Sequence, residues 1–245
     1  KEFYIIGEPI DTDIGTLYPV KVKDYPSFIQ HINTVLFDKR DLLFFLKGMV
    51  SQNSELQPLL DFADDMPLYD FIIYFSGEIY RGSFLHDLYE QYKALFQFCF
   101  HKDVFDKIQD SEEFEYYINL IKEFNDLNQE KISHNPEIAR FDRMKRLLAE
   151  AKGESITFEA MYTSILLSSN THPNDMTLYQ FNKAFDRITQ YKANDTTTLF
   201  STVSNEVDII PWYGSKPKET KSFITEEQLN QARANKQNKG LQRKL

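Results

Sequence analysis

The spacing of apolar residues changes near residue 25 of the chain. Before residue 25, apolar runs lie on either side of glycines, aspartates and a proline in FYIIGEPIDTDIGTLYPVKVKDY. This pattern is typical of a small β-hairpin. Beyond residue 25, apolar residues recur at intervals of three and four, the period of an amphipathic α-helix. The pattern predicts a mainly α protein: a helical bundle with a small N-terminal β-hairpin and a polar, basic C-terminal tail.

Each expected helix has a local start signal. Proline suits the first helical position, and Ser, Thr, Asp and Asn side chains accept hydrogen bonds from the free N–H groups of the first turn. The expected starts are Pro26, Asp41, a point near Ser83, Ser111, Asn135, a point near Phe158, and Thr177, which can form a capping box with Gln180. The run FIIYF, residues 71–75, fits either a strand or a buried turn of helix.

The same spacing predicts which side chains face the core. The expected inward residues are Phe28, Ile29, Ile32 and Leu36; Phe114, Tyr117, Ile118, Ile121 and Phe124; Phe158, Met161, Tyr162, Ile165 and Leu166; and Leu178, Phe181, Phe185 and Ile188. Later in the chain, Thr196–Thr198 and Val203–Ile210 permit either a short helix and a strand or an extended arm.

These elements suggest three parts of the chain. Residues 1–25 form a β-hairpin packed on the body, and residues 26–213 form a helical domain, for which a split into two subdomains near residues 101–111 is an alternative. Residues 214–245 form a basic tail, flexible or marginally helical, because its apolar residues are too sparse for a core.

Charge is distributed unevenly. The formal net charge is −9, but residues 214–245 alone hold eight Lys or Arg against three Glu, a net of +5, which leaves −14 for residues 1–213. Within this acidic body, SHNPEIARFDRMKRLLAEAKG, residues 133–153, joins an apolar stripe to basic residues that lie largely off it: Arg140, Arg143, Lys145, Arg146 and Lys152. They form either a solvated face paired with nearby carboxylates or a docking surface for an acidic or polar partner.

The sequence offers little chemistry for an enzyme. The five histidines are scattered, without metal-ligand spacing, and the common nucleophile and phosphate-binding motifs are absent. The pairs Asp11 with Asp13 and Asp64 with Asp65 are expected in solvated turns, and Cys99, inside the apolar run ALFQFCF, is expected to be a buried, inert thiol. We therefore expect a protein that is not an enzyme and has no catalytic, cofactor or metal site.

Composition also bears on partners and compartment. The acidic body opposes the approach of phosphates, which disfavours nucleic acid. No apolar run approaches the roughly 20 residues that span a bilayer, and a single cysteine suits a reducing compartment. The expectation is a soluble, cytoplasmic protein without a membrane partner.

Four motifs follow one another towards the end of the body. The first is a basic helix that begins with NPE at residues 135–137. The others are MT-x-x-Q-F followed by RI at 176–188, DTT-x-LF-x-x-VS at 195–204, and IIPW ending at Trp212. Their order resembles that of tail assembly chaperones of tailed bacteriophages infecting Gram-positive bacteria. The resemblance covers about residues 110–212; it is looser over the N-terminal part, and the lysine-rich stretch after Trp212 departs from it.

The resemblance implies a non-enzymatic, mostly helical protein that binds the tape measure protein in the host cytoplasm, before tail-tube subunits polymerise around it. The expected partner contacts are three arginines of the basic helix and three aromatic anchors, with a core position as the alternative for the aromatics: Arg140, Arg143, Arg146, Tyr179, Phe185 and Trp212. The alternative function is a structural subunit of the tail or baseplate that stays in the virion. Other tail proteins as partners, and a homo-oligomer, stay open.

Overall fold

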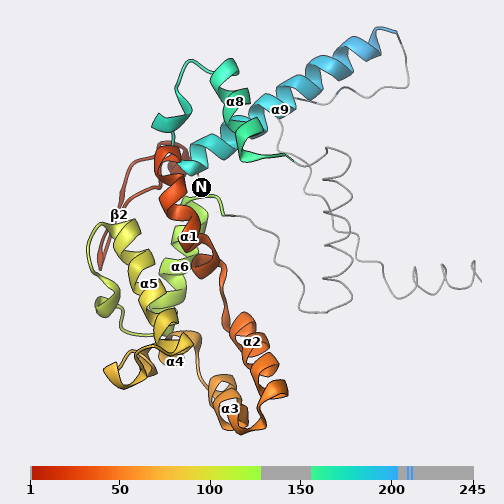
Figure 1. Cartoon of the computed structure of the whole chain (residues 1–245). Coiled ribbons are helices and arrows are strands. Elements are labelled where there is room, and N and C mark those ends of the chain that lie inside the picture. The colour runs from red at the N-terminus through yellow and green to blue at the C-terminus, as the bar shows by residue number, and fades with distance from the viewer. Residues whose placement is uncertain (1, 128–155, 204–208, 210, 212–245) are drawn as a thin grey trace, which may run out of the picture. The chain divides into compact units, whose positions relative to one another are not determined.

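The computed structural model describes residues 2–127, 156–203, 209 and 211 (Figure 1). In these residues the chain forms one antiparallel strand pair and eight α-helices, which confirms the mainly α prediction: β1 (Ile10–Thr12), β2 (Gly15–Leu17), α1 (Tyr25–Leu36), α2 (Lys39–Gln52), α3 (Gln57–Asp65), α4 (Leu68–Tyr74), α5 (Phe84–Phe100), α6 (Ser111–Phe124), α8 (Phe158–Ser168) and α9 (Leu178–Ser201). Short 3-10 helices lie between them: η1 (Glu2–Ile5), η2 (Val22–Asp24), η3 (Ser54–Leu56), η4 (Glu78–Tyr80), η5 (Phe105–Lys107) and η6 (Pro173–Asp175).

The chain divides into two compact units, Lys1–Thr189 and Gln190–Leu245. Helix α9 contributes residues to both units. Residues 101–111 lie inside the first unit, and the predicted boundaries after residues 25 and 213 stay predictions. The basic helix at 133–153 and the tail at 214–245 lie outside the described residues.

The N-terminal hairpin is the predicted β element. β1 and β2 pair antiparallel, with Ile10 opposite Leu17 and Thr12 opposite Gly15. The Thr12 hydroxyl donates a hydrogen bond of 2.6 Å to the carbonyl oxygen of Gly15, which closes the turn. Because Leu17 is fully buried, one side of this ribbon contributes to the core.

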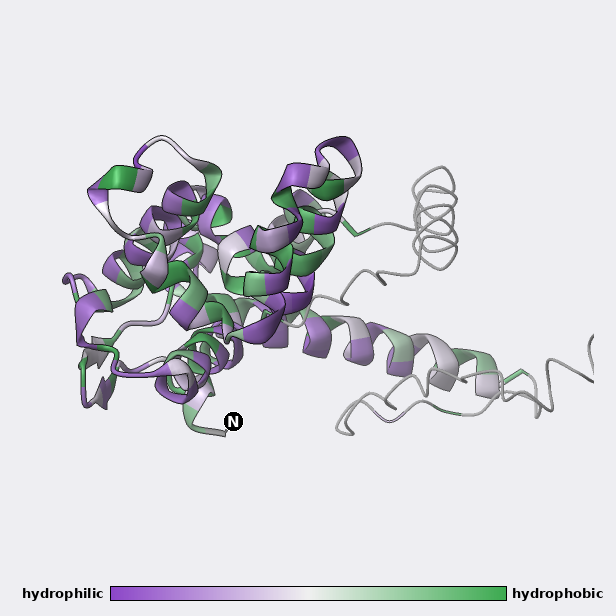
Figure 2. Cartoon of the chain, turned by 90° about the horizontal axis from the view of Figure 1, so that it is seen from below, coloured by the Kyte–Doolittle hydropathy of each residue, from purple (hydrophilic) through white to green (hydrophobic). Residues whose placement is uncertain are grey.

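Helix α5 is central to the core of the first unit. Its buried residues face α1 and α4, and its rings meet those of α6, for example Tyr92 and Phe114 at a centroid distance of 5.2 Å. Figure 2 shows that the helices mix hydrophobic and hydrophilic residues along their length. Aromatic rings from three elements meet around Phe96: Phe105 at a centroid distance of 5.3 Å and Phe114 at 6.3 Å. The aromatic content of the sequence therefore forms a ring-packed core, in which edge-to-face contacts add to the burial of apolar area.

An extended segment, residues 18–22, joins three helices that are far apart in the sequence. The Tyr18 N–H donates to the carbonyl of Cys99 at the end of α5, at 3.0 Å, and the Val20 N–H donates to Oδ1 of the buried Asn125 just after α6, also at 3.0 Å. The Val22 N–H donates to the carbonyl of Met176 at 2.9 Å, and the Leu178 N–H donates to the carbonyl of Val20 at 2.8 Å.

Two helix caps differ from the predicted residues. Asp38, not Asp41, caps α2: its Oδ1 accepts from the Arg40 N–H at 2.9 Å, while Asp41 accepts from the Asp38 N–H and completes a capping box. Asp110, not Ser111, caps α6, accepting from the Glu113 N–H at 2.9 Å. In both cases the cap is the residue with extended backbone dihedrals directly before the helix, and sequence spacing alone does not fix that residue.

Most of the other predicted helix signals are confirmed. Ser83 caps α5 through the His86 N–H at 3.2 Å, and Thr177 and Gln180 form the expected capping box. The whole predicted face of α6 is buried, and FIIYF belongs to α4 and the residue after it. Ile29 was wrongly assigned to the inward face of α1, because Phe28, Ile32 and Val35 form the buried stripe.

Helix α9 is longer than the sequence suggested. Thr196–Thr198 lies within it rather than in a separate short helix or an extended arm. The hydroxyls of Thr196 and Thr197 donate to the carbonyls four residues earlier, at 2.8 and 2.9 Å. These side-chain bonds satisfy the hydroxyl groups inside the helix, although bonds of this kind do not raise the low helix propensity of threonine.

Candidate protein-interaction surface

Helix α8 is short and carries apolar side chains on several sides. Thr157 caps it by accepting from the Ala160 N–H at 3.1 Å. Ile165 is buried, whereas Leu166 is 45% exposed and Leu167 is 86% exposed. Since successive helix residues are about 100° apart, Leu167 lies on the side opposite Ile165. Leu166, which the spacing placed on the inward face, is therefore on the surface.

Phe158 fixes the start of α8 to the rest of the first unit. Its ring is stacked on Tyr25 of α1, with a centroid distance of 4.7 Å and an interplanar angle of 9°, and on Phe181 of α9 at 5.3 Å. The ring still exposes 38% of its surface. We call Leu166 and Leu167 together the α8 surface. Phe158, nine residues before Leu167, lies on the opposite side of the helix.

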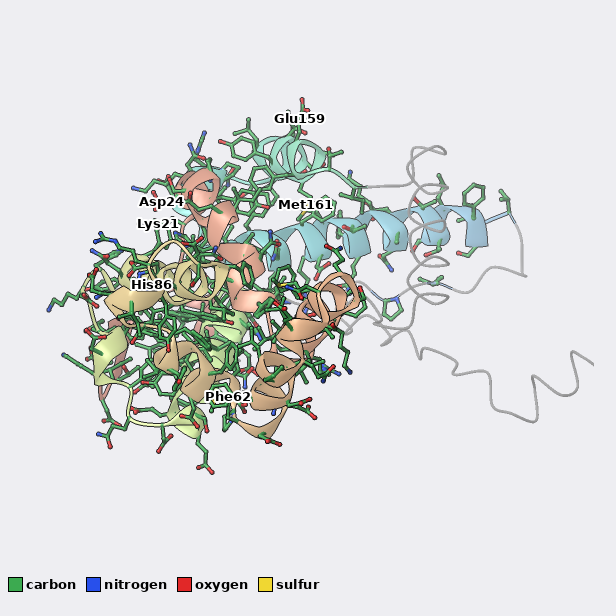
Figure 3. All side chains as sticks on the ribbon, turned by 60° about the horizontal axis from the view of Figure 1, so that its bottom comes forward. Lys21, Asp24, Phe62, His86, Glu159 and Met161 are labelled. Carbon is green, nitrogen blue, oxygen red and sulfur yellow. The ribbon has the colours of Figure 1, made fainter. Side chains whose placement is uncertain are left out.

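A pocket of about 340 Å³ opens beside Phe158. Its lining is mainly apolar: Tyr25, Ile32, Leu127, Phe158, Met161, Leu178 and Phe181, with Asn125, Asp126 and Asn182 as the polar members. Glu159 points outward from α8, and Met161 lies on the opposite side, towards the pocket (Figure 3). The Asp126 carboxylate accepts from the Lys183 ammonium at 2.8 Å, so its charge is balanced at the rim. The pocket can take an apolar side chain, and the thioether of Met161 adapts to its shape.

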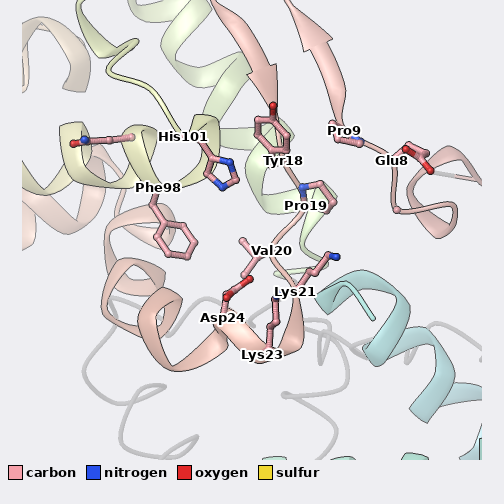
Figure 4. Close-up of a pocket in the computed structure, with 12 residues that line it drawn as sticks. Glu8, Pro9, Tyr18, Pro19, Val20, Lys21, Lys23, Asp24, Phe98 and His101 are labelled. Atoms are coloured by element: carbon pink, nitrogen blue, oxygen red, sulfur yellow. The ribbon is translucent and has the colours of Figure 1, made fainter. Parts of the chain in front are cut away.

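A larger groove, of about 670 Å³, lies on another part of the first unit (Figure 4). His101, which has a left-handed backbone with φ of 56°, stacks on Tyr18 at 4.3 Å, and both line the groove together with Phe98. Four charged residues also line the groove, Glu8, Lys21, Lys23 and Asp24, among uncharged ones that include Pro9, Pro19 and Val20. The groove therefore combines a stacked pair of rings with side chains of both charges.

The buried titratable chemistry is limited in the described part of the chain. Cys99 is buried, and desolvation raises the pKa of its thiol to about 12, so the thiol is protonated at neutral pH. The carboxylates of Asp11, Asp13, Asp64 and Asp65 are exposed, as expected, but only Asp13 lies in a turn: Asp11 belongs to β1, and Asp64 and Asp65 belong to α3. Within residues 2–127 and 156–203, no three His, Cys, Asp or Glu side chains are grouped as metal ligands would be. The helices described there include none that is long and apolar enough to cross a bilayer.

Two of the predicted partner contacts lie on the first turns of α9. The Tyr179 ring is buried, edge-on to Tyr4 at 5.7 Å, and the Lys183 ammonium lies 5.1 Å from its centroid. Phe185 is half-buried and packs against the core. Both rings are held within the fold, and a partner-binding role for them stays a prediction.

The other four predicted contacts, Arg140, Arg143, Arg146 and Trp212, lie outside the described residues. The structure therefore does not bring the six residues together as one site. Leu167 was not among the surface residues predicted from the sequence. The signal for it is the pair of consecutive leucines in ILLSS, because one helix stripe cannot bury three adjacent apolar side chains.

Comparison with known proteins gives a family. Residues 1–134, more than half of the chain, match the family described as the YomV N-terminal domain. The SPbeta prophage-derived uncharacterized protein YomV of Bacillus subtilis (strain 168) is 25% identical over 215 residues, which cover 86% of this chain and 86% of that protein. No solved structure matches the chain. The chain is similar to this prophage-derived protein, and it belongs to the YomV N-terminal domain family.

Proposed function

We propose that the protein is a non-enzymatic tail assembly chaperone, which binds the tape measure protein in the host cytoplasm during phage tail morphogenesis. The observation that carries the proposal is the α8 surface, where Leu166 and Leu167 are exposed on a helix that is apolar on several sides. The motif order of the sequence and the prophage-derived relative supply its biological setting.

The physical task of such a chaperone suits this surface. A tape measure protein is long and helical, and it exposes apolar stripes until the tail tube covers them. A partner that covers such a stripe needs exposed apolar side chains of its own and a recess for a side chain that projects from the stripe. The α8 surface supplies the first. The pocket beside Phe158 supplies the second, on the side of α8 opposite Leu167, so the two take different segments of the partner.

Co-expression with the tape measure protein of the same phage, followed by pull-down of the full chain, tests the proposal. We expect a complex that persists when salt is raised, because apolar contacts are not screened. The double variant Leu166→Ser with Leu167→Ser should weaken capture about tenfold or more, since it removes two exposed apolar contacts.

A matched control is Ile6→Ser, which removes an equally apolar side chain that is 58% exposed elsewhere on the first unit. It should leave capture unchanged. If no complex forms at any salt concentration, or if the control weakens capture as much as the α8 variant does, the chaperone proposal is wrong.

The alternative is a structural subunit of the tail or baseplate, and one observation favours it. In the second unit, the end of α9 exposes Tyr191, Leu199 and Phe200, each by more than half. An apolar arm of this kind could be covered permanently by neighbouring subunits in a particle. Mass spectrometry of purified virions distinguishes the two functions, because stoichiometric copies in the particle support the structural role and their absence supports the chaperone.

A further inference from the structure

A second apolar surface lies on the first unit, built from α2, α3, α4, η4 and the start of α5. Two ring contacts join these elements: Phe45 stacks on Phe84 at 4.3 Å, and Phe62 meets Tyr74 edge-on at 4.9 Å. Tyr74 also lies 6.0 Å from Tyr80 of η4. We call the exposed members of this group the Tyr74 surface: Phe45, Ile73, Tyr74, Ile79 and Phe84.

Core packing does not account for the outer residues of the Tyr74 surface. Ile79 is 86% exposed and Tyr74 is 54% exposed, although both are large and apolar. Ile79 sits in a short 3-10 helix between Gly77 and Gly82. Clustered apolar side chains of this kind mark contact sites more often than isolated ones do.

The charge around the Tyr74 surface is strongly negative. Residues 39–90, from the start of α2, carry nine carboxylates against four Lys or Arg, a net of −5 without histidine. Arg81 pairs with Glu78 at 3.2 Å. Five of the carboxylates are exposed and form no ion pair within the part of the chain that the structure describes: Asp61, Asp64, Asp65, Asp70 and Asp87.

Helix geometry places three of these carboxylates beside the apolar residues. Asp70 precedes Tyr74 by one turn on α4, Asp65 follows Phe62 by three residues on α3, and Asp87 follows Phe84 by three residues on α5. Side chains three and four residues apart are neighbours on a helix face. The surface thus presents apolar rings with carboxylates at their edges.

From this juxtaposition we infer that the Tyr74 surface binds a cationic amphipathic helix of a protein partner. The apolar stripe of the partner helix covers Tyr74, Ile79 and Phe84. The lysines or arginines of that helix reach Asp65, Asp70 and Asp87. A helix fits better than an extended strand, because this surface is made of helix faces and the described strand pair, β1 with β2, lies elsewhere in the chain. The negative field repels an anionic membrane and a second copy of the acidic body.

The inference rests on the proposed function only for the partner's identity. If the protein is a tape measure chaperone, the bound segment is a basic, helical stretch of the tape measure protein. The chemistry of the surface can be tested without that protein.

Fluorescence anisotropy with the full chain tests the surface. The probe is a labelled leucine–lysine peptide of about five helical turns, with its leucines on one face. The comparison peptides are the same pattern with glutamate in place of lysine, and a leucine–lysine peptide whose leucines are spread around the helix. We expect only the first peptide to bind tightly, with an affinity that falls as salt rises.

Two variants locate the site. Ile79→Ser with Tyr74→Ser should weaken binding about tenfold, and Asp65→Asn with Asp70→Asn and Asp87→Asn should weaken it about fivefold and reduce the salt dependence. The matched control replaces three exposed carboxylates elsewhere on the first unit, Asp13→Asn with Glu112→Gln and Glu115→Gln, and should bind as the wild type does. Circular dichroism melts confirm that each variant is folded.

The inference is wrong if the glutamate peptide binds as tightly as the lysine peptide, or if both Tyr74-surface variants bind the lysine peptide as the wild type does. It is also wrong if the control variant loses as much affinity as the Tyr74-surface variants do. The two proposals can fail separately. If the peptide binds but the tape measure protein is not captured, the Tyr74 surface is supported and the chaperone function is wrong. If the tape measure protein is captured equally well by the Tyr74-surface variants, the chaperone function is supported and this surface does not contribute to it.

Discussion

The α8 surface and the Tyr74 surface expose the same kind of side chain in different electrostatic settings. Glu159 is the one charged residue within α8, and it points away from the pocket side, whereas the Tyr74 surface lies in a stretch, residues 39–90, with a net charge of −5. Exposed apolar area by itself attracts any apolar partner, because the hydrophobic effect is not directional. The carboxylates around Tyr74 add a selection by charge that α8 does not have.

The two surfaces also differ in how firmly they are built. The Tyr74 surface stands on α4 and α5, whose inner sides are buried in the aromatic core. Helix α8 fully buries Ile165 alone. Met161 and Tyr162 are partly buried, Phe158 is held by its stacked ring, and the Tyr162 hydroxyl donates to Oδ1 of Asn174 at 3.0 Å. Few buried contacts give a helix a low free energy of local opening. We expect α8 to adjust to its partner and the Tyr74 surface to act as a rigid contact.

The largest effect should come from removing the ring that holds α8. Phe158→Ala deletes the stack on Tyr25 and Phe181 and should lower the free energy of unfolding by about 2–3 kcal/mol, less than for a fully buried phenylalanine because the ring is partly exposed. Urea unfolding followed by circular dichroism measures it. Phe158→Leu should recover part of the loss, and a change below about 0.5 kcal/mol would show that α8 is held by other contacts.

A pair of cap variants gives an intermediate effect and compares the two surfaces directly. Ser83→Ala removes the cap of α5 and Thr157→Ala removes the cap of α8, each worth about 1 kcal/mol. For Ser83→Ala the loss should appear in global unfolding, because α5 is central to the core. For Thr157→Ala it should appear as faster hydrogen exchange confined to residues 158–168. Similar behaviour of the two variants would contradict the difference in rigidity.

The smallest effect concerns pH and involves neither surface. Burial lowers the pKa of His31, whose ring lies 5.3 Å from Phe98. The unfolded chain therefore binds a proton more readily than the folded one, so this contribution to stability is full above pH 6.5, the unperturbed value, and is lost as pH falls below it. In His31→Gln, melting temperatures between pH 7.5 and 5.5 should fall less than in the wild type. An identical fall in both proteins would assign the pH dependence to other groups.

Sequence spacing predicted the buried face of α6 in full, because Phe114, Tyr117, Ile118, Ile121 and Phe124 follow one helical stripe that a neighbouring helix covers. It failed where coverage depends on distant elements. Ile29 continues the stripe of α1 but is left at its edge, and Leu166 continues that of α8 but faces solvent. Local periodicity states which residues share a face, whereas tertiary packing decides how wide the covered stripe is.

The candidate surfaces were less predictable than the fold. The acidic character of residues 39–90 can be read from composition, but the ring contacts of Phe45 with Phe84 and of Phe62 with Tyr74 join residues 12 to 39 positions apart. No helical period links such positions. The α8 surface carried a local signal, the consecutive leucines of ILLSS, because a single helical stripe cannot include three adjacent residues.

The extended segment at residues 18–22 has a consequence for the order in which the protein can be completed during synthesis. Its Tyr18 and Val20 N–H groups find acceptors within residues 1–134, but the Val22 N–H and the Val20 carbonyl pair with Met176 and Leu178. A ribosome must therefore add about 150 residues after Val22 before those two groups are satisfied, and early parts of a chain emerge long before late ones. The N-terminal domain of the family is thus finished by residues that lie beyond it in the sequence.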